Sequence, residues 1–282
     1  MKIKFLGTGG AEGFPALACS CSYCKKAKRL KGKDIRTRSQ TIIDSRLLID
    51  FGPDTLAHFH QYNINFNKIN NILITHHHED HLCVSELLYT NNIFKNKKDN
   101  HIVNVYLSQT SFDHIEKYIY LRFEKSPSEF YQNIKFHIIK AFDEIDIDGY
   151  KITPLMANHM AIKDEAFVYL IRKNEQTLLY FCDSGTVLPE TYDYLKNNNI
   201  QIDSIIFDCA KGKSDDSYKG HMNIDDVVKM SDAFISDKIL KDKKKLYLTH
   251  ISHKGKLNHE EFVKAVKKYS LKVAFDGLTY IL

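Results

Sequence analysis

The 282-residue sequence has no tryptophan, only five prolines and no apolar run of the length that crosses a membrane. A transmembrane helix needs about 18 or more apolar residues, so no transmembrane helix is predicted. The opening residues, MKIKFLGTGG, reach glycine too soon to contain the apolar region of a signal peptide. We therefore expect a cytoplasmic protein whose thiols are kept reduced. Without tryptophan or recognisable RNA-stacking aromatics, sequence-specific nucleic-acid recognition has little support.

The sequence also lacks internal repeats, Pro/Gly/Ser-rich linkers and low-complexity tails. A chain of this length with 43% hydrophobic residues can bury one large core, so we predict a single domain over residues 1–282. The formal net charge is +5, and much of the excess lies in two lysine runs, at 95–98 and 241–245. Such runs are typical of solvated loops, so the charge agrees with an anionic ligand without requiring one.

Short apolar segments rich in β-branched and aromatic residues predict strands. These segments are 3–7, 46–52, 71–75, 103–107, 136–140, 178–185, 204–209, 246–250 and 271–275. Helical patterns cover 112–124, 188–197, 224–238 and 258–269. Strands dominate the first half of the chain, which favours an α/β fold with sheets packed on each other and helices outside. Four polar residues end or follow such strands and are expected to share one rim, namely His76, Asp183, Asp208 and His250.

A histidine-rich segment, THHHEDH at 75–81, follows one of these strands. His76, His78, Asp80 and His81 fit the pattern H-x-H-x-D-H. In an extended turn, residues two apart point to the same side, so His76 and His78 can bind one cation while Asp80 and His81 turn toward a second. Imidazole and carboxylate suit zinc, manganese and iron, so the residue types leave the metal open. This spacing after a strand favours a metal site over a solvated turn.

The histidine segment is one of an ordered set of motifs that spans nearly the whole chain. The others are LLIDFG (47–52), ANHM (157–160), FCDSG (181–185) and LTHISH (248–253). The set resembles the metallo-β-lactamase superfamily, in the phosphodiesterase branch that contains tRNase Z. This resemblance implies an α/β fold, a four-layer αβ/βα sandwich with two divalent metal ions, zinc or manganese, at one edge.

The resemblance also implies the metal ligands by motif. The first ion would be held by His76, His78 and His159, and the second by Asp80, His81 and His250, with Asp183 bridging the two. Asp50 would support the ligating histidines from behind. Val84 stands where the superfamily commonly has a glycine that permits close helix packing, so the following helix is expected to shift slightly, with no ligand lost.

Two such metals generate hydroxide near neutral pH and stabilise the attacking and leaving oxygens of an in-line displacement, which suits a phosphodiester. The leaving alkoxide needs a proton donor. His221, in a Gly-His turn before a helix that Asn223 is expected to cap, is the candidate, and phosphodiesterase members of the superfamily carry a histidine in this segment. Asp80 and His221 are therefore the predicted catalytic residues. The glycine-rich loop 7–15 matches no nucleotide motif and is interpreted as a tight turn under the site.

Three of the six cysteines, Cys19, Cys21 and Cys24, lie within six positions. In a reducing compartment such clusters hold metal more often than they form disulfides. Structural zinc takes four ligands, and His253, three residues after His250, is the attractive fourth. The remaining cysteines, Cys83, Cys182 and Cys209, are interpreted as core thiols.

The cysteine cluster indicates one particular branch of the superfamily. Together with LTHISH and the segment FDGL (275–278), it is similar to the phosphoribosyl cyclic phosphate phosphodiesterase branch, the PhnP-like proteins, in which such residues hold a structural zinc. Two alternatives stay open. A PqqB-like cofactor-biosynthesis protein would have an incomplete histidine pattern, whereas this chain keeps every ligand position. A tRNase Z-like endonuclease would carry a Gly/Pro-rich arm, which is absent, although the lysine-rich stretch 93–101 could contact a nucleic-acid backbone.

The predicted function is therefore hydrolysis of a small anionic phosphodiester, a cyclic ribose phosphate by resemblance, through attack of a metal-bridging hydroxide. Nucleic acid is a disfavoured but open partner, and homodimer formation stays open. We expect segment 91–147 to be the region that selects the substrate.

Overall fold

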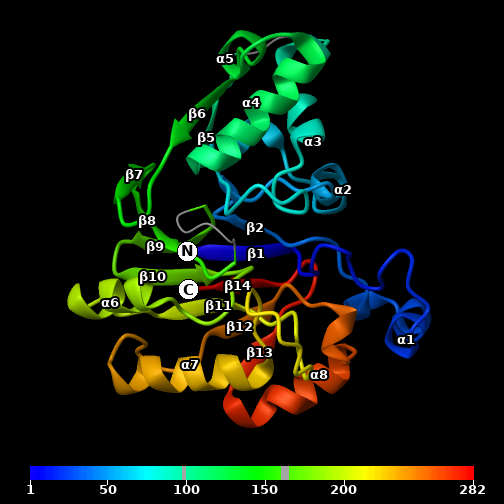
Figure 1. Ribbon diagram of the computed structural model, residues 1–282, viewed down its shortest axis with the longest axis vertical. Helices are drawn as coiled ribbons and strands as arrows, with labels where there is room; N and C mark the ends of the chain where they lie inside the picture. Colours follow the sequence, from blue (N-terminus) through cyan, green and yellow to red (C-terminus); the bar gives the residue numbers. More distant parts are fainter. Residues whose placement is uncertain (97–99, 160–164) are drawn as a thin grey trace.

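A computed structural model describes residues 1–96, 100–159 and 165–282, and within these ranges the chain forms two seven-stranded mixed sheets (Figure 1). The first sheet has the order β14 (Thr279–Ile281), β1 (Lys2–Gly7), β2 (Gln40–Ile43), β3 (Leu47–Ile49), β4 (Asn71–Leu73), β5 (Val103–Leu107), β6 (Ile134–Ile138). The second has the order β13 (Leu271–Val273), β12 (Leu246–Thr249), β11 (Ser204–Asp208), β10 (Gln176–Phe181), β9 (Phe167–Lys173), β8 (Tyr150–Met156), β7 (Ile145–Ile147).

Helices cover the outer face of each sheet (Figure 1). The first sheet carries α2 (Thr55–Gln61), α3 (Val84–Leu88), α4 (Gln109–Phe123) and α5 (Pro127–Phe130), and the second carries α6 (Pro189–Asn197), α7 (Ile224–Ser236) and α8 (His259–Val266). The helix α1 (Ser22–Leu30) lies to one side. Within the described residues, no helix is both long and apolar enough to span a membrane.

Three buried clusters of apolar side chains hold these layers together. One lies between the sheets, around Phe5 and Tyr169. A second joins the first sheet to its helices, around Ile72 and Ile115, and a third joins the second sheet to its helices, around Phe207 and Phe262. Three interfaces require four layers, so the predicted four-layer αβ/βα sandwich is confirmed.

All nine predicted strands exist, with ends shifted by a few residues, but β2, β7, β8, β9 and β14 were not predicted. Of these, β9 carries the uninterrupted apolar run Phe167–Ile171, a pattern that indicates a strand buried on both faces. The cap at Asn223 is present as predicted, because its side chain accepts a bond from the backbone N–H of Asp226, the third helical residue, and the Asp226 carboxylate accepts from the backbone N–H of Asn223. At the start of α8, the Glu261 carboxylate accepts from the backbone N–H of Asn258 at 2.9 Å.

The parallel part of each sheet gathers polar residues at one edge. Strands β3, β4 and β5 run parallel, as do β10, β11 and β12. The carboxyl ends of parallel strands lie at the same edge, so the residues that follow them meet there. This is the predicted rim, and both sheets contribute to it.

Asp44, in the turn between β2 and β3, ties the first sheet to the second. Its carboxylate accepts hydrogen bonds from Tyr150 Oη at 2.6 Å and Lys173 Nζ at 2.7 Å, and from the backbone N–H of Lys2 at 2.7 Å. Burial alone would raise the pKa of Asp44, but these donors outweigh it and lower that pKa to about 2. The stabilisation that the ionised Asp44 gives the folded state is therefore complete above the pKa of this carboxyl in the unfolded chain. It is lost as the pH falls from about 4 toward 2.

We expect Asp44→Asn to lower the melting temperature by several degrees at pH 7 and to have a much smaller effect near pH 2. Asparagine tolerates the left-handed backbone of this turn, where φ of residue 44 is 49°, so the variant tests the charge rather than the backbone. Thermal unfolding at both pH values measures the effect, and Asp143→Asn, at an exposed position, is the control. A pH-independent difference between Asp44→Asn and wild type would contradict the assignment.

Candidate active site and metal centres

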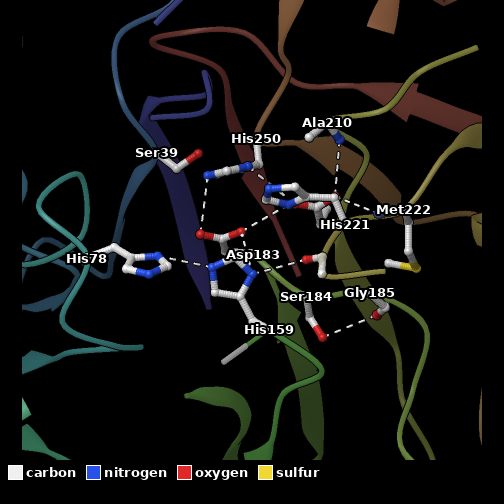
Figure 2. Close-up of polar contacts among 12 residues, drawn as sticks. Ser39, His78, His159, Asp183, Ser184, Gly185, Ala210, His221, Met222 and His250 are labelled. Atoms are coloured by element: carbon white, nitrogen blue, oxygen red, sulfur yellow. Dashed lines mark hydrogen bonds and ion pairs between the residues drawn. The ribbon is translucent and has the colours of Figure 1, made fainter. Parts of the chain in front are cut away.

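The turn after β4 brings two histidines against His159 and Asp183. His78 Nδ1 lies 2.9 Å from His76 Nε2 and 3.1 Å from His159 Nε2, and His76 Nε2 lies 3.3 Å from Asp183 Oδ2. Figure 2 shows His78 and His159 pointing toward each other, beside Asp183. These four residues each offer one ligand atom, and the atoms lie within 4.8 Å of one another. They are the predicted first ligand set with its bridging aspartate.

The second predicted set meets on the other side of Asp183. His81 Nε2 lies 3.0 Å from Asp183 Oδ2 and 3.1 Å from Asp80 Oδ2. His250 Nε2 lies 3.5 Å from each of the same two oxygens. The side chains of all four residues are buried, and Asp183 Oδ2 is shared with the first set. The tertiary structure therefore brings together all seven residues that the sequence assigned to the dinuclear site.

The spacing and the unmet bonding needs of these atoms fit divalent cations. Tetrahedral ligands at about 2.0–2.1 Å from zinc stand roughly 3.3 Å from one another, which is the spacing seen in both sets. Several buried atoms that face the centre, including Asp80 Oδ2, His81 Nε2 and His250 Nε2, have no hydrogen-bond partner among the described residues. Buried polar atoms without partners are costly, and a bound cation would satisfy them. The imidazole nitrogens and carboxylate oxygens are not soft ligands that select one metal, so zinc and manganese are both suitable.

The charges of the site favour the ligating forms of Asp80, Asp183 and His76, but not those of His81 and His250. Burial alone would lower the pKa of these two imidazoles, but the carboxylates around them outweigh it. The pKa of His250 is raised to about 9 and that of His81 well above its ordinary value, so a metal would displace a proton from each. Burial alone would raise the pKa of Asp80, but His81 and His250 hold it well below its ordinary value. The pKa of Asp183 is likewise lowered, since His250 and His159 outweigh burial. Burial, helped by the nearby His81, lowers the pKa of His76 to about 3, so this imidazole is neutral at pH 7. Carboxylates that stay ionised and a neutral imidazole are the forms that bind metal.

Two buried carboxylates orient the ring nitrogens that face away from the centre. Asp50 Oδ2 lies 2.7 Å from His81 Nδ1, and Asp50 Oδ1 accepts bonds from the backbone and hydroxyl of Thr75. Asp50 was predicted from the sequence to have this supporting role. Asp208, which the sequence placed on the rim without a role, has Oδ2 3.3 Å from His250 Nδ1. Carboxylates on the second nitrogen fix the tautomer and orientation of a ligating imidazole.

His221 lies next to the two metal-ligand sets, and Asp208 is its main partner. His221 Nδ1 is 3.0 Å from Asp208 Oδ2. It is also 3.0 Å from Asp183 Oδ1, and Figure 2 shows His221 beside Asp183. Burial alone would lower the pKa of His221, but Asp208 and Asp183 outweigh it and raise that pKa to about 11. The imidazole therefore carries a proton at neutral pH. The pairing with Asp208 was missed at the sequence level, because nothing local links residues 208 and 221.

Several residues at the strand ends that carry these groups have an unusual backbone conformation. Asp50, Asp183 and His250 have φ of 68°, 53° and 57°. Non-glycine residues seldom adopt positive φ, and such residues cluster at functional sites. Gly52 lets the backbone of Asp80 pass close to it, because a Cβ at position 52 would stand 2.1 Å from the carbonyl oxygen of Asp80. Val84 does not disturb the ligands, since its side chain is buried among apolar neighbours at the start of α3.

A pocket of about 330 Å³ opens above the cluster. Its walls beyond the candidate ligands and His221 are Gly10, Ala11, Glu12, Ala210, Lys211, Ser214, Asp216, Tyr218, Ser252 and Lys254. The glycine-rich loop thus borders the pocket instead of only turning beneath it. No described residue of 91–147 lines this pocket. The prediction that this segment selects the substrate is therefore wrong as far as the walls of the pocket are concerned. The reason is topological, because most of that segment forms β5, α4, α5 and β6 at the far end of the first sheet, and its last residues form β7 at the edge of the second (Figure 1).

The cysteine cluster forms a separate group of possible ligands. Cys19 Sγ and Cys21 Sγ lie 3.5 and 3.7 Å from His253 Nδ1, and Cys24 completes the group. With zinc–sulfur bonds of about 2.3 Å, tetrahedral sulfur and nitrogen ligands stand roughly 3.6 Å apart, so the group fits zinc. Hydrogen bonds from the Cys24 N–H and from His253 outweigh burial and lower the pKa of Cys21 to about 6. The Cys21 thiolate, the metal-binding form, is therefore present at neutral pH.

The other cysteines lie outside this group. Cys182 and Cys209 are fully buried, as predicted for core thiols. Cys83 is only partly buried at the N-terminus of α3, so its prediction as a core thiol is wrong. All six cysteines are free thiols.

Comparison with known proteins agrees with this geometry. Residues 45–251, more than half of the chain, match the Beta-lactamase superfamily domain. A crystal structure of a new diphosphatase from the PhnP family is 23% identical, with 99% of this chain and 97% of that one covered and a TM-score of 0.73. Zn²⁺-bound PqqB from Methylobacterium extorquens is 17% identical, with 100% of both chains covered and a TM-score of 0.75. At such identities these two structures show a shared fold.

A curated relative is also detected by sequence. An octanoyltransferase from Porphyromonas gingivalis is 27% identical over 165 residues, which cover 56% of this chain and 31% of that protein. The match therefore spans about a third of the relative's length and carries no activity over to this chain. The domain match over 45–251, the two stacked mixed sheets and the clustered histidines and aspartates together show that this chain belongs to the metallo-β-lactamase superfamily.

Proposed function

We propose that this protein is a dinuclear metal-dependent phosphodiesterase that hydrolyses a small anionic phosphodiester. The observation that carries the proposal is the pair of ligand sets sharing Asp183 Oδ2 directly beneath the 330 Å³ pocket. His76, His78 and His159 would hold one divalent ion, and Asp80, His81 and His250 the other. Bound metals would lower the pKa of a water between them and stabilise charge on the phosphate oxygens.

The protein's own groups would handle orientation and the proton. Asp50 and Asp208 hold the imidazoles of His81 and His250 from behind, so the ligand atoms are oriented before substrate arrives. His221, held through Nδ1 and protonated at neutral pH, can give a proton to the leaving alkoxide, and its pairing with Asp208 favours its return to the charged form after each turnover.

The pocket supports a small anionic substrate. Its volume suits a small molecule rather than a folded RNA, and Lys211 and Lys254 bring positive charge to its rim. A cyclic ribose phosphodiester is the proposed substrate, in keeping with the likeness to a diphosphatase of the PhnP family. Precursor tRNA, the alternative, would need a surface beyond these walls.

Three further parts of the proposal concern metals, location and organisation. Zinc or manganese would occupy the paired sites, and one zinc would bind Cys19, Cys21, Cys24 and His253. The free thiols suit the reducing cytoplasm. Residues 1–282 would act as one domain, since residues as distant as Gly10 and Lys254 line one pocket.

Metal analysis and turnover of bis-(p-nitrophenyl) phosphate test the proposal. We expect two metal equivalents beyond the one at the cysteines, and activity that needs zinc or manganese. Cyclic ribose phosphates, cyclic nucleotides and precursor tRNA should then be compared by kcat/KM, with the first group highest. Absence of phosphodiesterase activity with every divalent ion would overturn the enzyme assignment, and preferred cleavage of precursor tRNA would favour the endonuclease.

We expect His221→Ala to slow hydrolysis of a phosphodiester with an alkoxide leaving group by about 10²–10⁴-fold, because a general acid contributes on this order. The same variant should hydrolyse bis-(p-nitrophenyl) phosphate at a rate close to wild type, since p-nitrophenolate departs without protonation. Parallel kcat measurements on the two substrates give the comparison. An equal loss on both would show that His221 contacts the phosphate or orders the site instead of donating a proton.

A further inference from the structure

Glu12 lies between the cysteine cluster and the candidate active site. It belongs to the loop between β1 and α1 and lines the pocket. Its Oε1 accepts a hydrogen bond from Ser252 Oγ and lies 3.4 Å from His253 Nε2, an ion-pair distance. One carboxylate therefore faces the substrate pocket and also contacts the segment that follows His250.

The contact reaches the nitrogen of His253 that the sulfurs leave free. His253 Nδ1 faces Cys19 and Cys21, so a metal in the cluster would bind Nδ1 and leave Nε2 to carry the proton. A carboxylate on that second nitrogen fixes the tautomer, holds the ring and raises the basicity of the ligand. Glu12 is the residue in this position.

The loop that carries Glu12 is also fixed to the catalytic edge. The backbone N–H of Gly10 donates to the carbonyl of Ile251 at 3.2 Å, and that of Ile251 donates to the carbonyl of Thr8 at 2.8 Å. A Cβ on Gly10 would stand 3.4 Å from His250 Cε1 and 3.6 Å from Glu12 Oε2. The Glu12 carboxylate and the His250 ring thus border the same small space.

We propose that Glu12 is a positioning residue that joins the two metal centres. It holds His253 for the metal at the cysteine cluster while its negative charge faces the pocket. The part of the inference that concerns the pocket rests on the proposed phosphodiester function. An anion bound there repels the Glu12 carboxylate toward His253, and this strengthens the hold on the cysteine-site metal. Because coupling between sites is reciprocal, the cysteine-site metal in turn affects how the pocket accepts an anion.

Cobalt substitution makes the cysteine site visible by its thiolate-to-cobalt absorption, a signal that the histidine and aspartate sites do not give. When a chelator is added, we expect this absorption to disappear about tenfold or more faster in Glu12→Gln than in wild type. This is the size of effect on metal binding that is typical when the partner of a metal ligand is removed. The melting temperature in excess metal should be unchanged. Glu260→Gln, an exposed carboxylate on α8, is the matched control and should behave as wild type.

Inorganic phosphate tests the link to the pocket. Phosphate should slow cobalt loss in wild type and leave the rate in Glu12→Gln unchanged. Equal release rates in wild type and Glu12→Gln would overturn the positioning role, and an equal phosphate effect in both proteins would overturn the link. Neither measurement uses turnover, so failure of the phosphodiesterase assignment, seen as absent hydrolysis, is distinguishable from failure of this inference.

Discussion

Asp183→Ala is expected to reduce kcat/KM for bis-(p-nitrophenyl) phosphate by about 10³-fold or more. Asp183 Oδ2 lies within 3.5 Å of His76, His81 and His250, so this oxygen belongs to both ligand sets. Removing it takes a ligand from each candidate ion and leaves the clustered imidazoles without their shared negative charge. Single groups that stabilise transition-state charge are worth about 10²–10³, and here two such centres are affected.

Metal analysis separates this effect from a general loss of structure. Asp183→Ala should weaken both sites, whereas Asp80→Ala should weaken the second set and leave the first, because Asp80 Oδ2 contacts His81 and His250. Asp193→Asn, an exposed position on α6, should keep full metal content and activity. Wild-type turnover by Asp183→Ala with its metals gone would show that the cluster is not the catalytic centre.

Cys21→Ser is expected to lose one zinc equivalent and to unfold more easily, by at least about 3 kcal/mol. Structural zinc sites contribute about 10–16 kcal/mol of apparent binding free energy in small peptides, and a site reduced to three ligands loses much of this. The loss should act through the fold, because the cluster fixes the loop before α1 to the segment carrying His253. Activity should therefore fall as a consequence of lower stability.

The matched control is Cys83→Ser, another partly exposed cysteine that no ligand group includes. Serine is a favourable residue at the N-terminus of a helix, so this variant should be close to wild type in stability. Denaturant unfolding with and without a chelator gives the comparison, since a chelator should destabilise wild type and have little further effect on Cys21→Ser. Equal stability of the two variants would argue against a metal at the cysteines.

Features that depend on neighbouring residues could be predicted from the sequence. The turn 76–81 sets its own ligand directions because its residues are at most five apart, and the cap at Asn223 needs only Asp226, the third helical residue. Apolar runs identified nine strands, but the two long strands of the hairpin β8 and β9 were missed. The mixed composition of β8, with Lys151, Thr153 and Pro154, hides the burial that tertiary packing gives it.

Features that depend on distant residues required the fold. Asp208 and His221 are joined only because β11 and the loop before α7 end at the same edge of the second sheet. Substrate selection was assigned to segment 91–147 from the sequence, although the pocket walls come from the loops around Gly10–Glu12, Lys211 and Ser252. Loops acquire neighbours from the strands they connect, and a linear pattern does not contain that order.

The sequence by itself therefore determined the family, the ligand types and their likeness to known motifs, because these depend on residue identity and short spacing. Only the tertiary structure decided which carboxylate supports which imidazole, which loops enclose the pocket and how Glu12 reaches His253 across 241 positions of chain. The physical reason is that two stacked sheets bring the ends of distant strands to one edge, where charges a few ångströms apart fix one another's protonation and orientation.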